Sequence, residues 1–173
     1  MLFHVSEEPN LDIFQPRPTP REGPCLSEPS VWAIDEAHLV NYLLPRDCPR
    51  VTFALAASTS EADRTRFFPA AVSRVVAIEA GWLVRAMTTA VYVYTLPPET
   101  FELFDANAGY WISREAVKRQ GVTEIRVAAL EITRRGAEVR LVESLWPLHD
   151  AVAASTLEFS MIRMRNAKQR LQA

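Results

Sequence analysis

The sequence predicts an α+β fold: a single domain over residues 1–173, with mixed or mainly antiparallel sheets of about seven strands, flanking helices and a C-terminal helix. Composition supports one hydrophobic core, because 49% of the 173 residues are hydrophobic and 23% are charged. Strand-like and helix-like patterns are interleaved without the regular spacing of βαβ units, which disfavours a doubly wound parallel sheet. The N-terminal third differs from the rest in its proline content, since eight of the twelve prolines lie in the first fifty residues and none lies between Pro98 and Pro147.

The N-terminal third combines short strands with irregular backbone. The segment LFHVS at 2–6 predicts a strand that lies inside a sheet. Residues 7–30 hold six prolines, which exclude helix and central strand, so this irregular segment is expected to be a functional cover or a disordered arm. VWAI at 31–34 predicts a second strand. Asp35 is suited to cap a helix over 36–44, which Pro45 ends.

The body from about residue 51 shows clearer periodicity. Further strands are predicted at 51–55, 75–80, 90–96, 109–113, 122–127 and 137–145. Helices are predicted after the capping residue Ser60, at 81–87, at 114–119 after Ser113, at 128–136 with Gly136 past its end, and over 150–171 with an irregular apolar stripe. Residues 99–105 fit either a helical turn or an edge strand.

Charge and cysteine content exclude several classes of protein. The formal net charge is -2, and the +3 carried by residues 151–173 is too weak for a nucleic-acid footprint. No segment is apolar enough to cross a membrane, and the N-terminus lacks a signal-peptide pattern. We therefore expect a cytoplasmic protein with reduced Cys25 and Cys48 and with no nucleic-acid or membrane partner. The cysteines lack metal-ligand spacing and the histidines are scattered, so no metal is expected.

The first strand and the following helix carry the candidate catalytic residues His4, Ser6 and Tyr42. His4 and Ser6 lie two apart, so both point to one strand face, where they suit hydrogen bonds to a ribose or an amide. The alternative is a buried histidine bonded to a backbone carbonyl. Asp35, His38 and Tyr42 share one face of the predicted helix, and a carboxylate beside an imidazole suits catalysis. The alternative is a capping Asp35 beside an exposed His38.

Arginines supply the candidate ligand-binding residues. Arg46 and Arg50 lie four residues apart, each directly after a proline that fixes the backbone, which predicts an anion clamp; the alternative is surface pairing with acids such as Asp47. Arg163 and Asn166 fall on adjacent turns of the predicted C-terminal helix, as a second polar group or as a solvated basic helix end. Trp32 and His38 complete the predicted ligand-binding set.

The sequence contains no motif that identifies a catalytic carboxylate or a phosphate-binding loop. Glu124, Glu131 and Glu143 each offer a carboxylate, and spacing selects none of them. The chain lacks a P-loop, a G-x-G-x-x-G, an H-E-x-x-H and a G-x-S-x-G motif. With five glycines and no cluster of them, a glycine-cradled phosphate site is not expected.

Three segments, LFHVS, VWAIDEAHLVNYLLPRDCPRV and FSMIRMRNA, resemble a family of uncharacterised bacterial proteins over nearly the whole chain. A remoter resemblance is to ADP-ribosyltransferase-like folds, which open with a strand bearing His followed by Ser or Thr, as in His4-Val5-Ser6. That resemblance implies NAD as ligand, His4 and Ser6 at the nicotinamide-side ribose, Tyr42 or Tyr110 stacked on nicotinamide, and a late glutamate that stabilises an oxocarbenium-like transition state. No motif in this sequence selects that glutamate.

Three functions follow as hypotheses. The first is a nucleotide-like, NAD-type ligand-binding protein with ADP-ribosyltransferase-like chemistry, which requires the candidate groups to converge in one pocket. The second is a non-catalytic binding module for a small anionic ligand, using an arginine cluster of Arg46, Arg50 and Arg163. The third is structural, with the arginines engaged in internal salt bridges. No pattern in the sequence indicates an oligomeric state.

Overall fold

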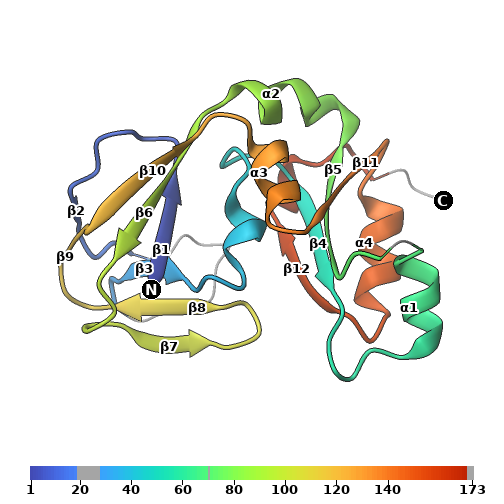
Figure 1. The fold of residues 1–173 in the computed structure, drawn as a ribbon, viewed down its shortest axis with the longest axis horizontal. Coiled ribbons are helices and arrows are strands. Elements are labelled where there is room, and N and C mark those ends of the chain that lie inside the picture. Colours follow the sequence, from blue (N-terminus) through green and yellow to red (C-terminus); the bar gives the residue numbers. More distant parts are fainter. Residues whose placement is uncertain (19–27, 70, 171–173) are drawn as a thin grey trace.

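The computed structural model describes residues 1–18, 28–69 and 71–170 and contains two main sheets side by side (Figure 1). Sheet A is antiparallel, in the order β10 (Gly121–Ile125), β6 (Val91–Leu96), β1 (Leu2–Ser6), β3 (Val31–Ile34), β8 (Tyr110–Ser113) and β7 (Glu102–Asp105). Sheet D has the order β11 (Glu138–Val142), β5 (Arg74–Glu79), β4 (Arg50–Ala54) and β12 (Glu158–Ile162); only β11 and β5 are parallel. The short strands β2 (Ile13–Phe14) and β9 (Val117–Lys118) pair separately. The α+β prediction is confirmed.

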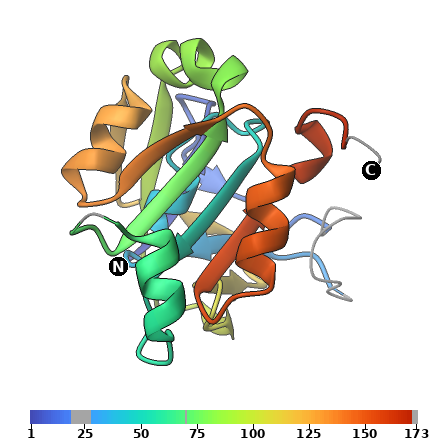
Figure 2. The same ribbon diagram turned by 90° about the vertical axis from the view of Figure 1, so that its right-hand side faces the viewer.

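Helices pack on and between the sheets. The described α-helices are α1 (Glu61–Phe67), α2 (Leu83–Thr88), α3 (Ala128–Arg134) and α4 (Trp146–Ala153), and the 3₁₀ helices are η1 (Leu39–Tyr42), η2 (Ala80–Trp82) and η3 (Met164–Asn166). Figures 1 and 2 show α1 and α4 on the outer side of sheet D, away from sheet A. None of these helices is long and apolar enough to cross a bilayer.

The core has three layers. Phe53, Phe67 and Leu145 belong to a cluster beneath α1 and α4 on the outer side of sheet D. A central cluster joins both sheets with η1, α2 and α3, and a third holds β2 and β9 against the far face of sheet A. Strand β5 shows why its sequence reads as a continuous apolar run: Val75 and Ala77 belong to the outer cluster, and Val76 and Ile78 belong to the central one.

Several local predictions are confirmed by particular contacts. Ser60 caps α1 by accepting the backbone N–H of Asp63 at 3.2 Å. Gly136 follows α3 with a φ of +81°, the left-handed backbone that glycine adopts freely. Of the two alternatives for residues 99–105, the edge strand forms at its end as β7, Glu102–Asp105, after a turn that the Phe101 N–H closes on the backbone oxygen of Pro98 at 3.0 Å.

Three predicted helices are wrong. Residues 36–44 form a turn and the 3₁₀ helix η1. Leu39, Val40, Leu43 and Leu44 are buried as an amphipathic helix would predict, but Asn41, which such a helix would expose, is buried as well.

Residues 114–119 include β9, since Val117 pairs with Phe14 of β2 and enters the third core cluster. The described part of the long helix predicted over 150–171, residues 150–170, instead contains the end of α4, strand β12 and η3. A helix does lie in the C-terminal region, but it is α4, which begins at Trp146 with Pro147 in its first turn.

The two central strands of sheet A separate from each other. Strand β1 pairs with β6 at five positions, from Leu2 opposite Leu96 to Ser6 opposite Tyr92, but it pairs with β3 only where Phe3 faces Ile34. Beyond that pair the sheet is split between the end of β1 and the start of β3. This split positions the site described next.

Candidate functional site: a cleft at the split in sheet A

A cleft of about 1140 Å³ opens at the split and reaches the end of β12 in sheet D. Seven of the nine residues predicted for the site line it: His4, Ser6, Trp32, Tyr42, Arg46, Arg50 and Arg163. They come from β1, β3, η1, the loop after η1, the start of β4 and the residue that follows β12. The cleft therefore gathers groups that are up to about 160 residues apart in sequence, through the pairing of strands.

His4 presents a neutral imidazole at the cleft. Its Nδ1 lies 2.9 Å from the backbone oxygen of Trp32, and because a carbonyl only accepts, Nδ1 carries the proton. Burial lowers the pKa of His4, and the nearby Arg46 and Arg17 lower it further. The second ring nitrogen, Nε2, is thus an acceptor, and no described residue bonds to it. Two residues on, the Ser6 hydroxyl accepts the N–H of Glu8 at 3.1 Å and keeps its own hydrogen to donate.

Aromatic side chains form one wall. The Tyr42 hydroxyl donates to that of Tyr110 at 2.5 Å, and the rings of Tyr110 and Trp32 meet edge to face at 5.6 Å. Burial, followed by the Tyr110 hydroxyl, raises the pKa of Tyr42, which keeps this phenol protonated. Register places Trp32 and Tyr110 on the face of sheet A opposite to His4, so the cleft passes through the split and touches both faces. The buried Nε1–H of Trp32 has no hydrogen-bond partner among the described residues.

Arginines occupy the other side of the cleft. Arg46 is exposed, and its backbone N–H donates to the Glu7 carboxylate at 2.7 Å, while its guanidinium forms no ion pair with any described residue. Arg163 donates weakly from Nε to the backbone oxygen of Arg46 at 3.4 Å. Arg163 is also the single non-glycine residue with a positive φ, +54°, in the described chain. A left-handed arginine costs about 1–2 kcal/mol, and here it turns the chain from β12 into η3 at the cleft.

Arg50 supports the loop beneath this cleft. It is 3% exposed, and its guanidinium donates to the backbone oxygens of Asn41, Pro45 and Cys48 at 2.9–3.2 Å. Of the predicted clamp, Arg46 therefore offers a free guanidinium, and Arg50 holds the loop that carries Arg46. Burial lowers the pKa of Arg50, and the Tyr42 ring lies 5.8 Å from its guanidinium carbon.

Two predicted residues do not line the cleft. His38 Nδ1 contacts Asp35 at 2.7 Å, and its Nε2 lies 3.4 Å from a Glu158 oxygen that also binds Arg74. The predicted contact of Asp35 with His38 therefore forms, but Tyr42 does not share their face, because the segment is not an α-helix and Tyr42 contacts Tyr110 instead.

Asn166 donates through Nδ2 to the backbone oxygen of Asp47 at 2.7 Å, which ties η3 to the Arg46 loop. The α-helix predicted to hold Arg163 and Asn166 on adjacent turns does not form, since Arg163 precedes the short 3₁₀ helix η3 with left-handed backbone.

The three candidate glutamates lie elsewhere. Glu124 pairs with Arg126, Glu131 with Arg135 and Glu143 with Lys168, and none of the three lines the cleft. Among the described residues, the acidic ones that line it are Glu7 and Glu8. Within residues 1–18, 28–69 and 71–170, no group of three or more His, Cys, Asp or Glu is arranged to hold a metal ion. Cys25 lies outside the described residues; burial raises the pKa of Cys48 to about 11, so its thiol is protonated at neutral pH.

Sequence reasoning missed Arg17, Glu7 and Glu8, which line the cleft from the proline-rich segment. Pairing positions this segment: Ile13 and Phe14 pair with β9, and Arg17 and Ser30 exchange backbone hydrogen bonds of 3.0–3.1 Å. The run P-R-P at 16–18 was the available signal, because flanking prolines fix an arginine in the way argued for Arg46.

Comparison with known proteins places the chain in one family. The model of the family of unknown function DUF6886 matches residues 3–167. The chain belongs to this family. The segments that suggested an uncharacterised family lie almost entirely within the matched span. No curated protein and no solved structure matches this DUF6886 chain. The comparisons give no support to the resemblance to ADP-ribosyltransferases.

Proposed function

We propose that the cleft binds a nucleotide-like ligand of the NAD type. The observation that carries this proposal is the convergence of a neutral histidine, aromatic rings and arginines on one concave surface. Few, convergent polar groups in a largely apolar pocket are typical of small-molecule sites.

The chemistry of the lining residues suggests which of them contact each part of such a ligand. The guanidinium groups of Arg46 and Arg163 suit phosphate oxygens, because the planar fork presents paired donors. The Nε2 acceptor of His4 and the Ser6 hydroxyl suit a ribose, whose hydroxyls both donate and accept. The unpartnered indole N–H of Trp32 supplies a further donor.

Transfer chemistry is less supported than binding. Departure of nicotinamide from NAD leaves a cation-like sugar that a carboxylate stabilises, and the described carboxylates at the cleft are Glu7 and Glu8. One of them, Glu7, already accepts the N–H of Arg46. Binding without transfer is therefore the function proposed here, and release of nicotinamide from NAD, followed by chromatography, tests the ADP-ribosyltransferase-like alternative.

The binding experiment is a thermal-shift screen with NAD, ADP-ribose, ADP, ribose 5-phosphate and inorganic phosphate. A ligand present at about one hundred times its dissociation constant adds about 2.7 kcal/mol of stability, which is easily measured. We expect ADP-ribose or NAD to raise the midpoint most. If no nucleotide or sugar phosphate shifts it, the proposal fails.

Two variants assign the binding to the cleft. Arg46→Gln removes an exposed guanidinium and is expected to weaken binding about tenfold or more, since a charge-assisted hydrogen bond contributes about 1.5–3 kcal/mol. Arg163→Gly removes the second guanidinium and keeps the backbone, because glycine adopts a positive φ freely. Arg64→Gln on the exposed side of α1 is the matched control. Unchanged affinity in both cleft variants would place the ligand elsewhere.

The same screen separates the anion-binding module from the nucleotide site. If inorganic phosphate binds as tightly as ADP-ribose, the arginines alone account for recognition. If His4→Gln weakens ADP-ribose and leaves phosphate unchanged, the ribose contact is supported.

A further inference from the structure

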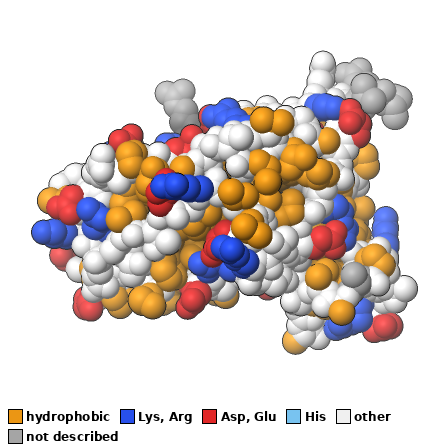
Figure 3. All heavy atoms as spheres, turned by 45° about the horizontal axis from the view of Figure 1, so that its top comes forward, with side chains coloured by type: hydrophobic (Ala, Val, Ile, Leu, Met, Phe, Trp, Pro, Cys, Tyr) orange, Lys and Arg blue, Asp and Glu red, His pale blue; other side chains and the backbone are white. Residues whose placement is uncertain are grey.

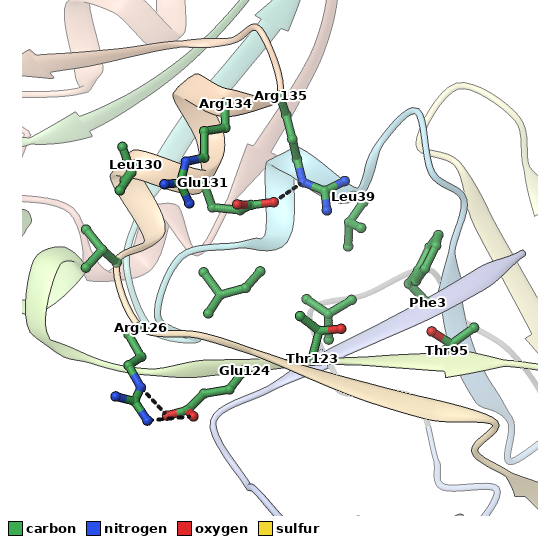
Figure 4. Close-up of a pocket in the computed structure, with 13 residues that line it drawn as sticks. Phe3, Leu39, Thr95, Thr123, Glu124, Arg126, Leu130, Glu131, Arg134 and Arg135 are labelled. Carbon is green, nitrogen blue, oxygen red and sulfur yellow. Dashed lines mark hydrogen bonds and ion pairs between the residues drawn. The ribbon is translucent and has the colours of Figure 1, made fainter.

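A second cavity, of about 480 Å³, lies between sheet A and α3 (Figure 4). Its floor is the face of β1, β6 and β10 that carries Phe3, Val93 and Ile125, and Leu39 of η1 closes one end. All four side chains are at least nine-tenths buried. The cavity shares Phe3 with the cleft, and its other lining residues are different ones, so a ligand here does not depend on the proposed function of the cleft.

The mouth of the cavity adds apolar surface. Leu130 projects from α3 at the mouth and is 47% exposed, which is high for a leucine on the helix face next to a cavity. Figure 3, which brings the top of the molecule in Figure 1 forward, shows apolar side chains exposed between neighbouring acidic and basic groups. A ligand with an apolar body would remove this surface from water.

The rim of the cavity carries one more arginine than glutamate. Arg126 forms two hydrogen bonds of 3.2 Å with Glu124, and Arg135 donates to Glu131 at 2.9 Å. Arg134 makes no ion pair with any residue in the described part of the chain, and Figure 4 shows its side chain beside Glu131 on the side opposite to Arg135. Both carboxylates are already neutralised by their partners, which leaves the guanidinium of Arg134 for an anion.

We propose that this cavity binds a small aliphatic monocarboxylic acid, with its chain on the apolar floor and its carboxylate on Arg134. A single surplus positive charge matches a monoanion, and the guanidinium fork matches the two oxygens of a carboxylate. The lining offers one aromatic ring, that of Phe3, and two hydroxyls, those of Thr95 and Thr123, which is a poor match for a base or a sugar.

The test is a calorimetric titration of hexanoate, octanoate and decanoate, with octanol and octylamine as uncharged and cationic counterparts of octanoate. Each added methylene is expected to tighten binding about fourfold per buried CH₂. Octanoate is expected to bind about tenfold or more tightly than octanol, and octylamine more weakly than octanol.

Variants test the assignment to this cavity. Arg134→Gln, an exposed substitution that the fold should tolerate, is expected to remove the preference for octanoate over octanol. Leu130→Ser is expected to weaken the dependence on chain length, and Arg64→Gln on α1 is the control that should bind like the native chain. Equal affinity for octanol and octanoate, or an unchanged preference in Arg134→Gln, would overturn the proposal. Absence of octanoate binding would also overturn it, whatever the outcome with nucleotides.

Discussion

Arg50 illustrates how a charged side chain can be structural although it touches the cleft. Its replacement by methionine would remove the guanidinium donors from the backbone oxygens of Asn41 and Cys48, whereas the oxygen of Pro45 would keep the N–H of Cys48. Each unsatisfied buried acceptor costs about 1–3 kcal/mol, so we expect Arg50→Met to lower the free energy of unfolding by about 2 kcal/mol or more. Urea denaturation measures this, with Arg46→Gln as the exposed control. A native-like midpoint for Arg50→Met would show that these carbonyls find other partners.

His4 makes stability depend on pH. Burial lowers the pKa of His4 below the ordinary 6.5. As the pH falls from 6.5 toward the lower pKa of the folded protein, His4 is therefore protonated in the unfolded chain but stays neutral in the folded one. The free energy of unfolding should therefore decrease from pH 7.5 toward the folded pKa, by about 1.4 kcal/mol for each unit of lowering. Denaturation at several pH values should give a shallower decline for His4→Gln. His38 and His149 remain in both proteins, so parallel curves would contradict the assignment to His4.

At the residue scale, the sequence could predict several members of the site but not their contacts. Alternation along a strand was enough to place His4 and Ser6 together, and flanking prolines marked Arg46. The partner of His4, the Trp32 carbonyl, could not be predicted, because a backbone oxygen carries no sequence signal and is brought close by strand pairing. The same holds for the contact of Tyr42 with Tyr110, which joins η1 to β8.

Among the elements, the turn before β8 supports the segment ahead of η1. Gly109 has a φ of +68°, and a Cβ there would lie 2.2 Å from Nδ1 of His38. Its carbonyl accepts the N–H of Asp35 at 3.1 Å. We expect Gly109→Ala to lower the free energy of unfolding by about 1–3 kcal/mol, because it combines strain with displacement of the His38 ring. Thermal denaturation checks this. Gly81→Ala, which has no atom within 4 Å of the new Cβ, should be neutral or slightly stabilising, and equal losses in both would exclude the proposed clash.

Elements with a clear local signal were predicted, and those defined by distant contacts were not. The cap of α1, the strand β6 and the glycine after α3 each follow from residues within the element. Segment 36–44 has helical spacing, but burial on every side overrides it. The run from 150 to 171 contains apolar residues that fit a helix, and β12 forms because Phe159 and Met161 lie beside Phe53 and Val51 of β4.

At the scale of the whole molecule, interleaved patterns and composition were sufficient for the fold class, whereas strand order was not. The cleft depends on which strands are neighbours: β1 and β3 must be adjacent and must separate for His4 and Tyr42 to reach the same space. No periodicity within either strand reports that adjacency. The proline-rich third did mark the region, since most of the cleft lining lies before residue 51.

The position of β1 also sets the order of events when the chain folds. The earliest strand in the sequence lies in the interior of its sheet, and its long ladder is with residues 92–96. The other sheet is completed only when residues 158–162 reach β4. Such distant pairings slow folding, and synthesis delivers the N-terminus first. Leu2, Phe3 and Val5 therefore remain without their partner strand until residues 92–96 have been made, and sheet D cannot close until residues 158–162 have been made.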